Sequence, residues 1–251
     1  MTQWAVVTGA SSGIGKEFAK QLAAEGMNLV LTARRKERLD ELAATLKVQV
    51  ECVALDLEDR EAPWQLLEFT DLKKINPALL INNAGFGMYG EVKDLDPERQ
   101  FAMILVNCAA VATLSRLYLP AMVARGSGEI LIVASTASFQ AVPYETTYAA
   151  TKAFDLIFAE GLAEEVKKHG IKVCALCPGQ TESEFQAIAN EKIPKGMSIH
   201  SAEEVARVGL KALRAGKHYV ICGFSNRMGM ELQRLAPRRL VTGISERMFR
   251  P

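Results

Sequence analysis

The sequence predicts a single α/β domain, with one doubly wound sheet of about seven parallel strands and helices on both faces. Short apolar runs rich in β-branched residues alternate with longer segments of helical periodicity along nearly the whole chain. No internal repeat, low-complexity tract or Pro/Ser-rich linker interrupts this alternation. With 251 residues, of which 49% are hydrophobic, the chain is long enough for one large core. We therefore expect one domain over residues 1–251.

Seven short segments have the length and apolar composition of buried strands. In chain order they are Trp4–Val7, Met27–Thr32, Val48–Leu55, Ala78–Ile81, Gly128–Ala134, Ile171–Leu176 and Tyr219–Cys222. Most of them are followed within two positions by glycine, asparagine, serine or proline, which are residues typical of turns.

The segments between these strands are predicted to be helical, because apolar residues recur at every third or fourth position. The helices start after Gly15 and then cover Lys36–Leu46, Glu58–Ile75, Pro97–Arg125, Thr147–His169 and Ser201–Ala215. Pro63 lies near the start of the third helix, where proline is tolerated. Ser201 and Glu204 form a capping-box pattern at the start of the last one. The stretch from Gln180 to His200 has no regular pattern.

The first strand runs into a glycine-rich turn, Thr8-Gly9-Ala10-Ser11-Ser12-Gly13-Ile14-Gly15. A residue without Cβ allows a tight turn and lets backbone N–H groups approach a phosphate, and the N-terminus of the following helix adds partial positive charge. The spacing differs from the common G-x-G-x-x-G, so the turn alone is a weak signal. We expect it to cradle a dinucleotide through Gly9, Ser11, Ser12, Gly13, Ile14 and Gly15.

Polar or glycine-rich clusters follow most of the predicted strands. In open α/β sheets, ligands bind outside the carboxyl ends of the strands. The clusters at residues 8–15, 33–35, 56, 82–85, 135–138 and 178–183 all fall at such ends. We therefore expect them to converge on one crevice.

Two arginines, Arg34 and Arg35, end the second strand at the place where an NAD site usually has an acidic residue, and the nearest acid is Glu37. A carboxylate would repel a 2′-phosphate, whereas a guanidinium group binds one through charge-assisted hydrogen bonds. The pattern indicates NADP(H) as the cofactor. The alternative is that both arginines are solvated loop residues.

Tyr148 and Lys152 lie four residues apart on a predicted helix and therefore on the same face. A nearby ammonium stabilises a phenolate, which lowers the pKa of the tyrosine from about 10 toward a value useful for acid–base chemistry. The pair alone is not specific, because short motifs recur by chance. Its position after a strand and a polar turn makes it the candidate catalytic pair.

The charge balance excludes some partners. The formal net charge is +1, so we expect no nucleic-acid partner. The first residues lack a basic signal-peptide region, and no apolar run reaches the length of about 18 residues that a transmembrane segment needs, so we expect a cytoplasmic protein.

The five cysteines are Cys52, Cys108, Cys174, Cys177 and Cys222, and they sit inside apolar segments. The pair Cys174 and Cys177 has the spacing of a redox site or half of a zinc site, but no second CxxC or histidine pair accompanies it. We interpret the cysteines as reduced core thiols and expect no metal site.

In order and spacing, these motifs resemble the short-chain dehydrogenase/reductase (SDR) family, of the NADP-preferring type with a Rossmann-type fold. The resemblance covers nearly the whole chain. The matching motifs are Thr8-Gly9-x-x-x-Gly13-x-Gly15, Asn82-Asn83-Ala84-Gly85, Asn107, Ser135, Tyr148-x-x-x-Lys152 and Pro178-Gly179.

The resemblance implies a catalytic role for four residues. Tyr148 is then the general acid in reduction and the base in oxidation, while Ser135 hydrogen-bonds the substrate carbonyl or hydroxyl. Lys152 binds the nicotinamide ribose and lowers the pKa of Tyr148. Asn107 holds a water that relays protons to Lys152.

The resemblance also implies further cofactor contacts. These are Asp56 and Leu57 at the adenine, Asn83, Ala84 and Gly85 on the adenosine ribose side, and Pro178, Gly179, Thr181 and Ser183 against the nicotinamide. Ser183 stands where the family often has threonine, a change that keeps the hydroxyl group.

Two segments are expected at the mouth of the crevice. Residues 183–200 carry four apolar side chains that suit either a substrate lid or ordinary packing, namely Ile188, Ile193, Met197 and Ile199. The tail, residues 228–251, is basic and amphipathic between Leu232 and Val241. It suits a membrane surface, a partner subunit or a cover over the site. We favour a lid or a subunit contact, because members of the resembled family usually form homodimers or homotetramers.

Together these features predict an NADPH-dependent carbonyl reductase that acts on a small-molecule ketone or alcohol, with an apolar ketone as the expected substrate. Two alternatives remain. One is an NADP-binding sensor or scaffold without turnover, and the other is an NAD-linked alcohol dehydrogenase. Because Asn107, Ser135, Tyr148 and Lys152 are all present, the sequence favours an enzyme over a sensor.

Overall fold

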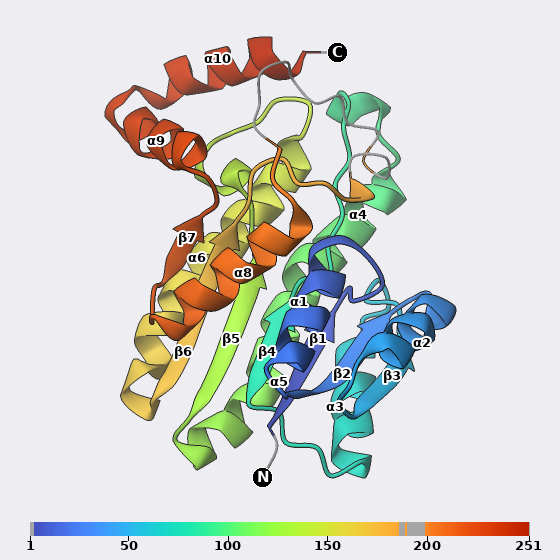
Figure 1. Ribbon diagram of the computed structural model, residues 1–251. Coiled ribbons are helices and arrows are strands. Elements are labelled where there is room, and N and C mark those ends of the chain that lie inside the picture. Colours follow the sequence, from blue (N-terminus) through green and yellow to red (C-terminus); the bar gives the residue numbers. More distant parts are fainter. Residues whose placement is uncertain (1–2, 186–188, 190–198, 251) are drawn as a thin grey trace.

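The structure, a computed structural model, describes residues 3–185, 189 and 199–250. Its centre is a seven-stranded sheet in which all neighbouring strands pair in parallel, in the order β3-β2-β1-β4-β5-β6-β7 (Figure 1). The strands are β1 (Trp4–Thr8), β2 (Asn28–Ala33), β3 (Val50–Ala54), β4 (Leu79–Asn82), β5 (Gly128–Val133), β6 (Ile171–Cys177) and β7 (Tyr219–Ile221). The strand order reverses between β1 and β4, so the crevice predicted from the sequence lies above these strands.

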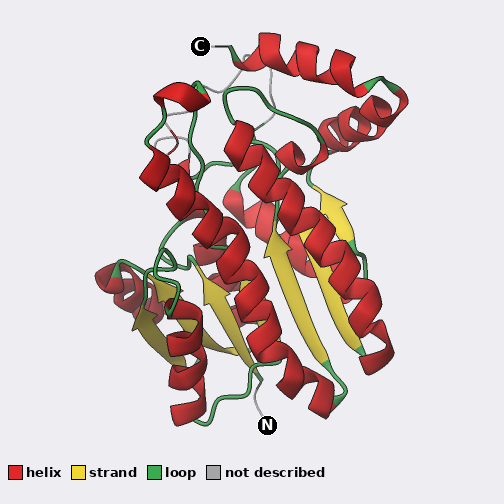
Figure 2. Ribbon diagram, turned by 180° about the vertical axis from the view of Figure 1, so that it is seen from behind, coloured by secondary structure: helices red, strands yellow, loops and turns green. Residues whose placement is uncertain are grey.

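Helices cover both faces of the sheet, as Figures 1 and 2 show from opposite sides. One face carries α1 (Gly13–Ala24), α2 (Lys36–Thr45) and α8 (Ala202–Arg214), and the other carries α3 (Ala62–Leu72), α4 (Pro97–Ile104), α5 (Ala110–Arg125) and α6 (Thr146–Val166). Two further helices, α9 (Phe224–Leu232) and α10 (Arg238–Phe249), lie beyond the end of the sheet that the strand arrows point toward (Figure 1).

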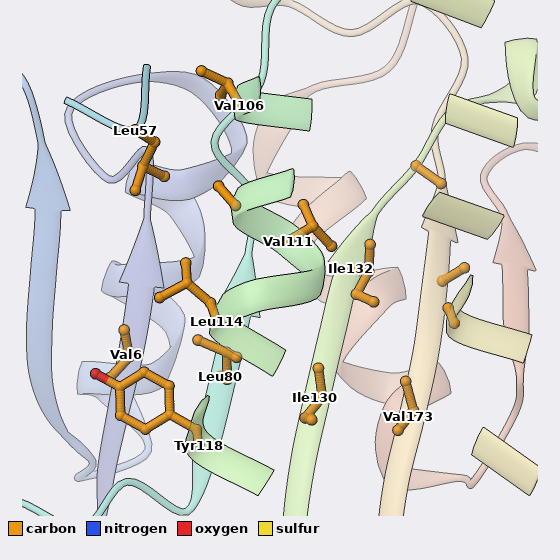
Figure 3. Packing of buried hydrophobic residues seen from close by; sticks show 14 of the residues in the cluster. Val6, Leu57, Leu80, Val106, Val111, Leu114, Tyr118, Ile130, Ile132 and Val173 are labelled. Carbon is orange, nitrogen blue, oxygen red and sulfur yellow. The ribbon is translucent and has the colours of Figure 1, made fainter. Parts of the chain in front are cut away.

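The core consists of two apolar layers, one on each face of the sheet. Side chains alternate between the faces of a strand, so Val6 packs on one side and Ala5 and Val7 pack on the other. Figure 3 shows the larger layer, in which Leu114 and Tyr118 of α5 pack over strand residues such as Leu80. Because both faces are covered, each central strand is apolar on both sides, which explains the near-continuous hydrophobic runs in the sequence.

The predicted fold class is confirmed, and the seven strands lie within two residues of their expected positions. The largest differences concern helices. The third helix begins at Ala62 rather than at residue 58, because the carboxylates of Asp56 and Asp59 accept hydrogen bonds from Glu58 N and Glu61 N and form turns there. The predicted helix 97–125 contains a π-helical turn, η2 (Leu105–Ala109), between α4 and α5.

The tail is more regular than the sequence suggested. The amphipathic stretch from Leu232 to Val241 is not one helix, because Ala236 is extended and Pro237 caps the start of α10. The segment is thus a pair of short helices joined by η5 (Gln233–Leu235).

One helical stretch among the described residues, Pro97–Arg125, is long and apolar enough to cross a membrane by length and composition, with a mean hydropathy of 1.6. This differs from the expectation from the sequence, in which no apolar run was long enough for a transmembrane segment. Half of its most apolar window is buried inside the fold, and a core helix of a soluble protein passes the same test, so the stretch is a weak signal for a membrane span.

Candidate active site

A cavity of about 1060 Å³ opens at the carboxyl ends of the strands and is bordered by the tail helices. Nearly all predicted site residues line it, and the structure therefore brings together groups that are far apart in sequence. They are Gly9, Ser11, Ser12, Gly13, Ile14, Arg34, Arg35, Asp56, Leu57, Asn83, Ala84, Gly85, Ser135, Tyr148, Lys152, Pro178, Gly179, Thr181 and Ser183. Two predicted residues, Gly15 and Asn107, are not among the described residues that line the cavity.

The glycine-rich turn needs its glycines for two different reasons. Gly9 adopts a φ of +64°, and a Cβ there would lie 2.8 Å from Asn83 Nδ2. Gly15 does not have a positive φ, and it must be glycine for steric reasons, since a Cβ there would meet Gly9 O of the turn at 2.3 Å. Gly15 therefore lets helix α1 pack against the turn, whereas Gly9 and Gly13 shape the surface that faces the cavity.

The N-terminus of α1 is suited to an anion. Its cap residue, Ser12, makes no side-chain cap hydrogen bond, and none of the residues in its first turn is acidic. The first N–H groups of a helix have no partner within the helix and carry a partial positive charge. They can therefore hold a phosphate at this edge of the cavity.

A buried threonine joins the turn to the end of β4. Thr8 Oγ1 donates to Ile81 O and accepts from Asn83 N and Ala84 N at 2.9 and 3.0 Å. Asn83 Nδ2 donates to Thr8 O at 2.9 Å. The Asn83 side chain thus stabilises the cradle, and the Asn83–Gly85 segment is fixed beside it.

The two arginines at the end of β2 have different surroundings. Arg35 Nη2 donates to the hydroxyls of Ser11 and Ser12 at 3.2 and 3.3 Å and lies 2.9 Å from a carboxylate oxygen of Glu184. Arg34 instead donates to Glu58 at 3.0 Å. Arg35 and the two serines thus form an anion cradle that holds the Glu184 carboxylate. The charge-assisted hydrogen bonds of a guanidinium group suit a phosphate as well.

Sequence reasoning missed Glu184, the residue directly after Ser183. Its second carboxylate oxygen accepts from Arg38 at 2.5 Å, and hydrogen bonds from Arg38 and Arg35 hold the pKa of Glu184 below its usual range. No sequence pattern predicts this contact, because Arg35 and Glu184 are 149 positions apart in the chain.

The catalytic candidates lie at the ends of β5 and α6. Ser135 caps a short 3-10 turn, η3 (Thr136–Phe139), and its Oγ accepts from Ala137 N at 3.1 Å. Ser138 Oγ in the same turn donates to Lys152 O at 2.7 Å, which ties the turn to α6. The ring of Tyr148 packs against Phe185, with ring centroids 5.3 Å apart.

Lys152 is almost fully buried. Its ammonium donates to Val133 O at 2.8 Å and to Asp155 Oδ2 at 2.9 Å. Asp155 is completely buried, and burial raises its pKa from 3.8 to about 6, although the nearby Lys152 acts in the opposite direction. The sequence carried a signal for this contact, an acid one turn after the lysine on the buried side of an apolar helix.

Asn107 lies behind the cavity, in the π-helical turn η2. Its Nδ2 donates to Phe86 O and Thr151 Oγ1, and its Oδ1 accepts from Phe86 N at 3.1 Å. A Cβ on Gly85 would lie 3.0 Å from Asn107 Oδ1 and 3.4 Å from Lys152 Nζ, so Gly85 separates the amide from the cavity. The side chain fastens the β4 loop to α6, and its role in proton relay stays a prediction.

The segment after β6 forms the remaining wall. Thr181 is buried and donates from Oγ1 to Gly179 O, and Ser183 donates to Thr181 O. A Cβ on Gly179 would lie 2.5 Å from Asn226 Nδ2 of α9, so this glycine allows α9 to pack close to the cavity.

The tail forms an apolar wall of the cavity, and the individual residues of this wall were not predicted from the sequence. It consists of Met230, Leu232, Ala236, Val241, Ile244, Met248 and Phe249. Tyr89 Oη donates to Phe249 O at 2.6 Å and Tyr144 Oη to Glu246 at 3.0 Å, which hold α10 over this rim. Of the four expected lid residues, Ile188, Ile193 and Met197 lie outside the described residues. Ile199 is half exposed and is not among the described lining residues.

A doubly wound parallel sheet with a glycine turn before its first helix defines a nucleotide-binding α/β protein. Comparison with known proteins narrows this class. The model of the short chain dehydrogenase family matches residues 3–194. The chain therefore belongs to the short-chain dehydrogenase family of oxidoreductases.

Several named proteins are similar to this chain. A very-long-chain 3-oxoacyl-CoA reductase from Anas platyrhynchos is 35% identical over 223 residues, which cover 85% of this chain and 71% of that protein. A short-chain dehydrogenase from Sphingobium yanoikuyae in complex with NADPH has a TM-score of 0.84 at 30% identity, with 95% of each chain covered. A bulky-bulky ketone specific alcohol dehydrogenase from Comamonas testosteroni has a TM-score of 0.77 at 27% identity, covering 93% of this chain and 92% of that one.

Proposed function

We propose that this protein is an NADP(H)-dependent carbonyl reductase that interconverts a ketone and a secondary alcohol, with Tyr148 as general acid and base. The observation that carries the proposal is that Ser135, Tyr148 and Lys152 line the same cavity as the Arg35 anion cradle. The similarity to a short-chain dehydrogenase in complex with NADPH supports the choice of cofactor.

The residues present fit a phosphorylated dinucleotide. The turn from Gly9 to Gly13 and the N-terminus of α1 would hold the central phosphates, and Arg35 with Ser11 and Ser12 would hold the 2′-phosphate. Asp56 and Leu57 would border the adenine, and Thr181 and Ser183 the nicotinamide. When bound, NADP(H) supplies or accepts the hydride.

The chain itself then has to orient the substrate oxygen and move a proton. Ser135 Oγ already accepts from Ala137 N, so its hydroxyl proton can be donated to the carbonyl oxygen. Tyr148 donates its proton to the same oxygen in reduction and takes it back in oxidation. The ammonium of Lys152 stabilises the phenolate that remains, because it brings positive charge to the same face of α6.

The substrate is proposed to be a ketone on an extended apolar chain, with 3-oxoacyl thioesters as the first class to test. The apolar wall from Met230 to Phe249 supports this, since it borders the end of the cavity beside Tyr144 and Tyr148. The name of the Anas platyrhynchos relative points to the same class. In this proposal the tail, residues 228–251, and the segment 183–200 act as covers of the substrate.

The test is NADPH oxidation with a panel of 3-oxoacyl thioesters of increasing chain length and of bulky ketones. We expect turnover in the wild type and a loss of several orders of magnitude in Tyr148→Phe. Tyr219→Phe, a tyrosine outside the described cavity lining, serves as the matched control and should keep its activity. Equal rates in the wild type and Tyr148→Phe, or NADPH binding without turnover, would favour a sensor or scaffold.

We also propose that the protein forms a homo-oligomer through α4 and α6. These two helices contact each other and expose large apolar side chains, with Phe101 59% and Ile157 68% exposed. Light scattering of Ile157→Glu should show dissociation, whereas Leu72→Glu on α3, where Leu72 is 77% exposed, should leave the mass unchanged.

A cytoplasmic location stays a proposal. All five cysteines are free, as a reducing compartment would keep them. Fractionation of cells that produce the protein, compared with a membrane marker, would test it.

A further inference from the structure

Asp155 is a buried acidic group that none of the roles above uses. It lies on α6, three residues after Lys152, and its exposed fraction is 0%. It is not among the described residues that line the cavity, so it does not touch substrate directly. Among the described residues, the hydrogen bond that its carboxylate accepts comes from the Lys152 ammonium, and Oδ1 is buried without a partner.

The contact limits what the Lys152 ammonium can do. An ammonium group has three N–H donors. One donates to Val133 O at 2.8 Å at the end of β5, and one to Asp155 Oδ2 at 2.9 Å. Among the contacts of the described residues, this leaves one N–H for the cavity that Lys152 lines. Asp155 therefore fixes the ammonium from behind, before any ligand binds.

Lys152 is also the charged group that Asp155 faces. The other titratable groups that interact with this carboxylate in the described part of the chain are the thiols of Cys108 on η2 and Cys177 on β6. Burial raises the pKa of Cys108 to about 12 and that of Cys177 well above its ordinary value, so both thiols are neutral near pH 7. The charge of the ammonium is therefore opposed by Asp155.

We propose that Asp155 is a positioning residue of the reaction, whose carboxylate holds the Lys152 ammonium in place and opposes its charge, and so sets how readily Tyr148 gives up its proton. The inference rests on the proposed function, because it assumes that Tyr148 is the acid and base.

The proposal has a definite sign. When Asp155 is ionised, the carboxylate and the ammonium sum to zero charge, so the phenolate of Tyr148 is stabilised less than it would be by a lone ammonium. Removal of the carboxylate leaves the ammonium unopposed. Tyr148 should then ionise at a lower pH.

The direct test needs neither cofactor nor substrate. The near-ultraviolet absorbance of tyrosinate is titrated in the wild type and in Tyr148→Phe, and the difference isolates Tyr148. The same pair is measured with Asp155→Asn added. We expect the Tyr148 midpoint to fall by about one pH unit. Glu165→Gln removes an exposed carboxylate from the same helix and should leave the midpoint in place. Coincident midpoints in the wild type and Asp155→Asn would overturn the proposal.

A second variant covers the case in which the buried amide prevents folding. Asp155→Leu makes the same change in charge without burying an unpaired amide, and the same fall in the midpoint is expected. The pH dependence of kcat for alcohol oxidation should move in the acid direction by a similar amount in both variants.

Failure of the two proposals can be told apart. If the wild type turns over no ketone, the proposed function fails, while the titration still decides the role of Asp155. If the wild type is active and the Tyr148 midpoints coincide, the role of Asp155 alone is wrong.

Discussion

The carboxylate of Glu184 lies 2.9 Å from the guanidinium of Arg35, at the same nitrogen that donates to Ser11 and Ser12. Glu184 follows the wall segment after β6, while Arg35 ends the segment after β2. The ion pair therefore connects the segments after β2 and β6, which form the two sides of the proposed 2′-phosphate site. A phosphate that enters this cradle has to compete with the carboxylate.

We expect Glu184→Gln to lower the Kd for NADPH about two- to fivefold, the range set by a partly exposed ion pair. The Kd for NADH should stay the same, since NADH has no 2′-phosphate, and the gain should shrink at high salt. Fluorescence titration measures both constants. Glu182→Gln, two residues earlier and exposed, is the control. An equal gain for NADPH and NADH would show that Glu184 does not act on the phosphate.

The two arginines should not contribute equally to cofactor choice. Arg35→Ala removes a donor from the cradle, and a hydrogen bond to a charged group is worth about 1.5–3 kcal/mol, so NADPH affinity should fall by tenfold or more. Arg34→Ala should cost less, because it is Arg35 that donates to the Ser11 and Ser12 hydroxyls, whereas Arg34 donates to Glu58 at 3.0 Å. Isothermal titration with NADPH and NADH checks the order. A wild-type preference for NADH, or a larger loss in Arg34→Ala, would contradict the assignment.

Gly15 and Gly161 provide a matched pair of helical glycines. A Cβ at Gly15 would meet Gly9 O at 2.3 Å, so Gly15→Ala should destabilise the fold by about 1–3 kcal/mol and weaken dinucleotide binding. Gly161 on α6 has nothing within 4 Å of its Cβ position, so Gly161→Ala should add about 0.5–1 kcal/mol. Calorimetric melting should move Tm in opposite directions. A neutral Gly15→Ala would mean that α1 does not pack against the turn as described.

The Asp155 carboxylate makes stability depend on pH with a definite sign. Its pKa is raised in the folded state, from 3.8 to about 6, so its contribution to stability is present below pH 3.8 and is lost as the pH rises through 6. The difference in stability between Asp155→Asn and the wild type should therefore change in favour of the variant as the pH rises from 4 to 7, by on the order of 3 kcal/mol at most.

Urea unfolding of both proteins at several pH values in this window measures the difference. Glu165→Gln should show a flat difference from the wild type, since that residue is exposed on the same helix. If the difference in the free energy of unfolding between Asp155→Asn and the wild type is the same at every pH, burial does not raise the pKa of Asp155.

Much of the site could be predicted because it consists of residues at strand ends. Once the alternation shows a parallel sheet, the turn at Gly9, the arginines after β2 and Ser135 after β5 must share one edge. Tyr148 and Lys152 follow from helical spacing alone. Nearly all of the predicted residues line one cavity, while their roles stay predictions.

Two contacts at the site could not be predicted from strand ends or helical spacing. Glu184 meets Arg35 only because β6 and β2 end at the same edge, and Asn107 meets Phe86 and Thr151 only because a π-helical turn presents its amide. Both contacts join segments far apart in the chain, and nothing in the local pattern selects one partner over another.

By itself, the sequence determined the parallel α/β sheet, the order of its strands and helices along the chain, and the groups that line its carboxyl edge. The physical reason is that periodicity, turn residues and capping are local properties of the chain. Only the tertiary structure decided that Gly15 serves packing, that Asn107 lies behind Gly85, that Glu184 occupies the Arg35 cradle and that Asp155 opposes Lys152. These depend on which side chains meet after the helices dock on the sheet, and on the burial that docking imposes on them.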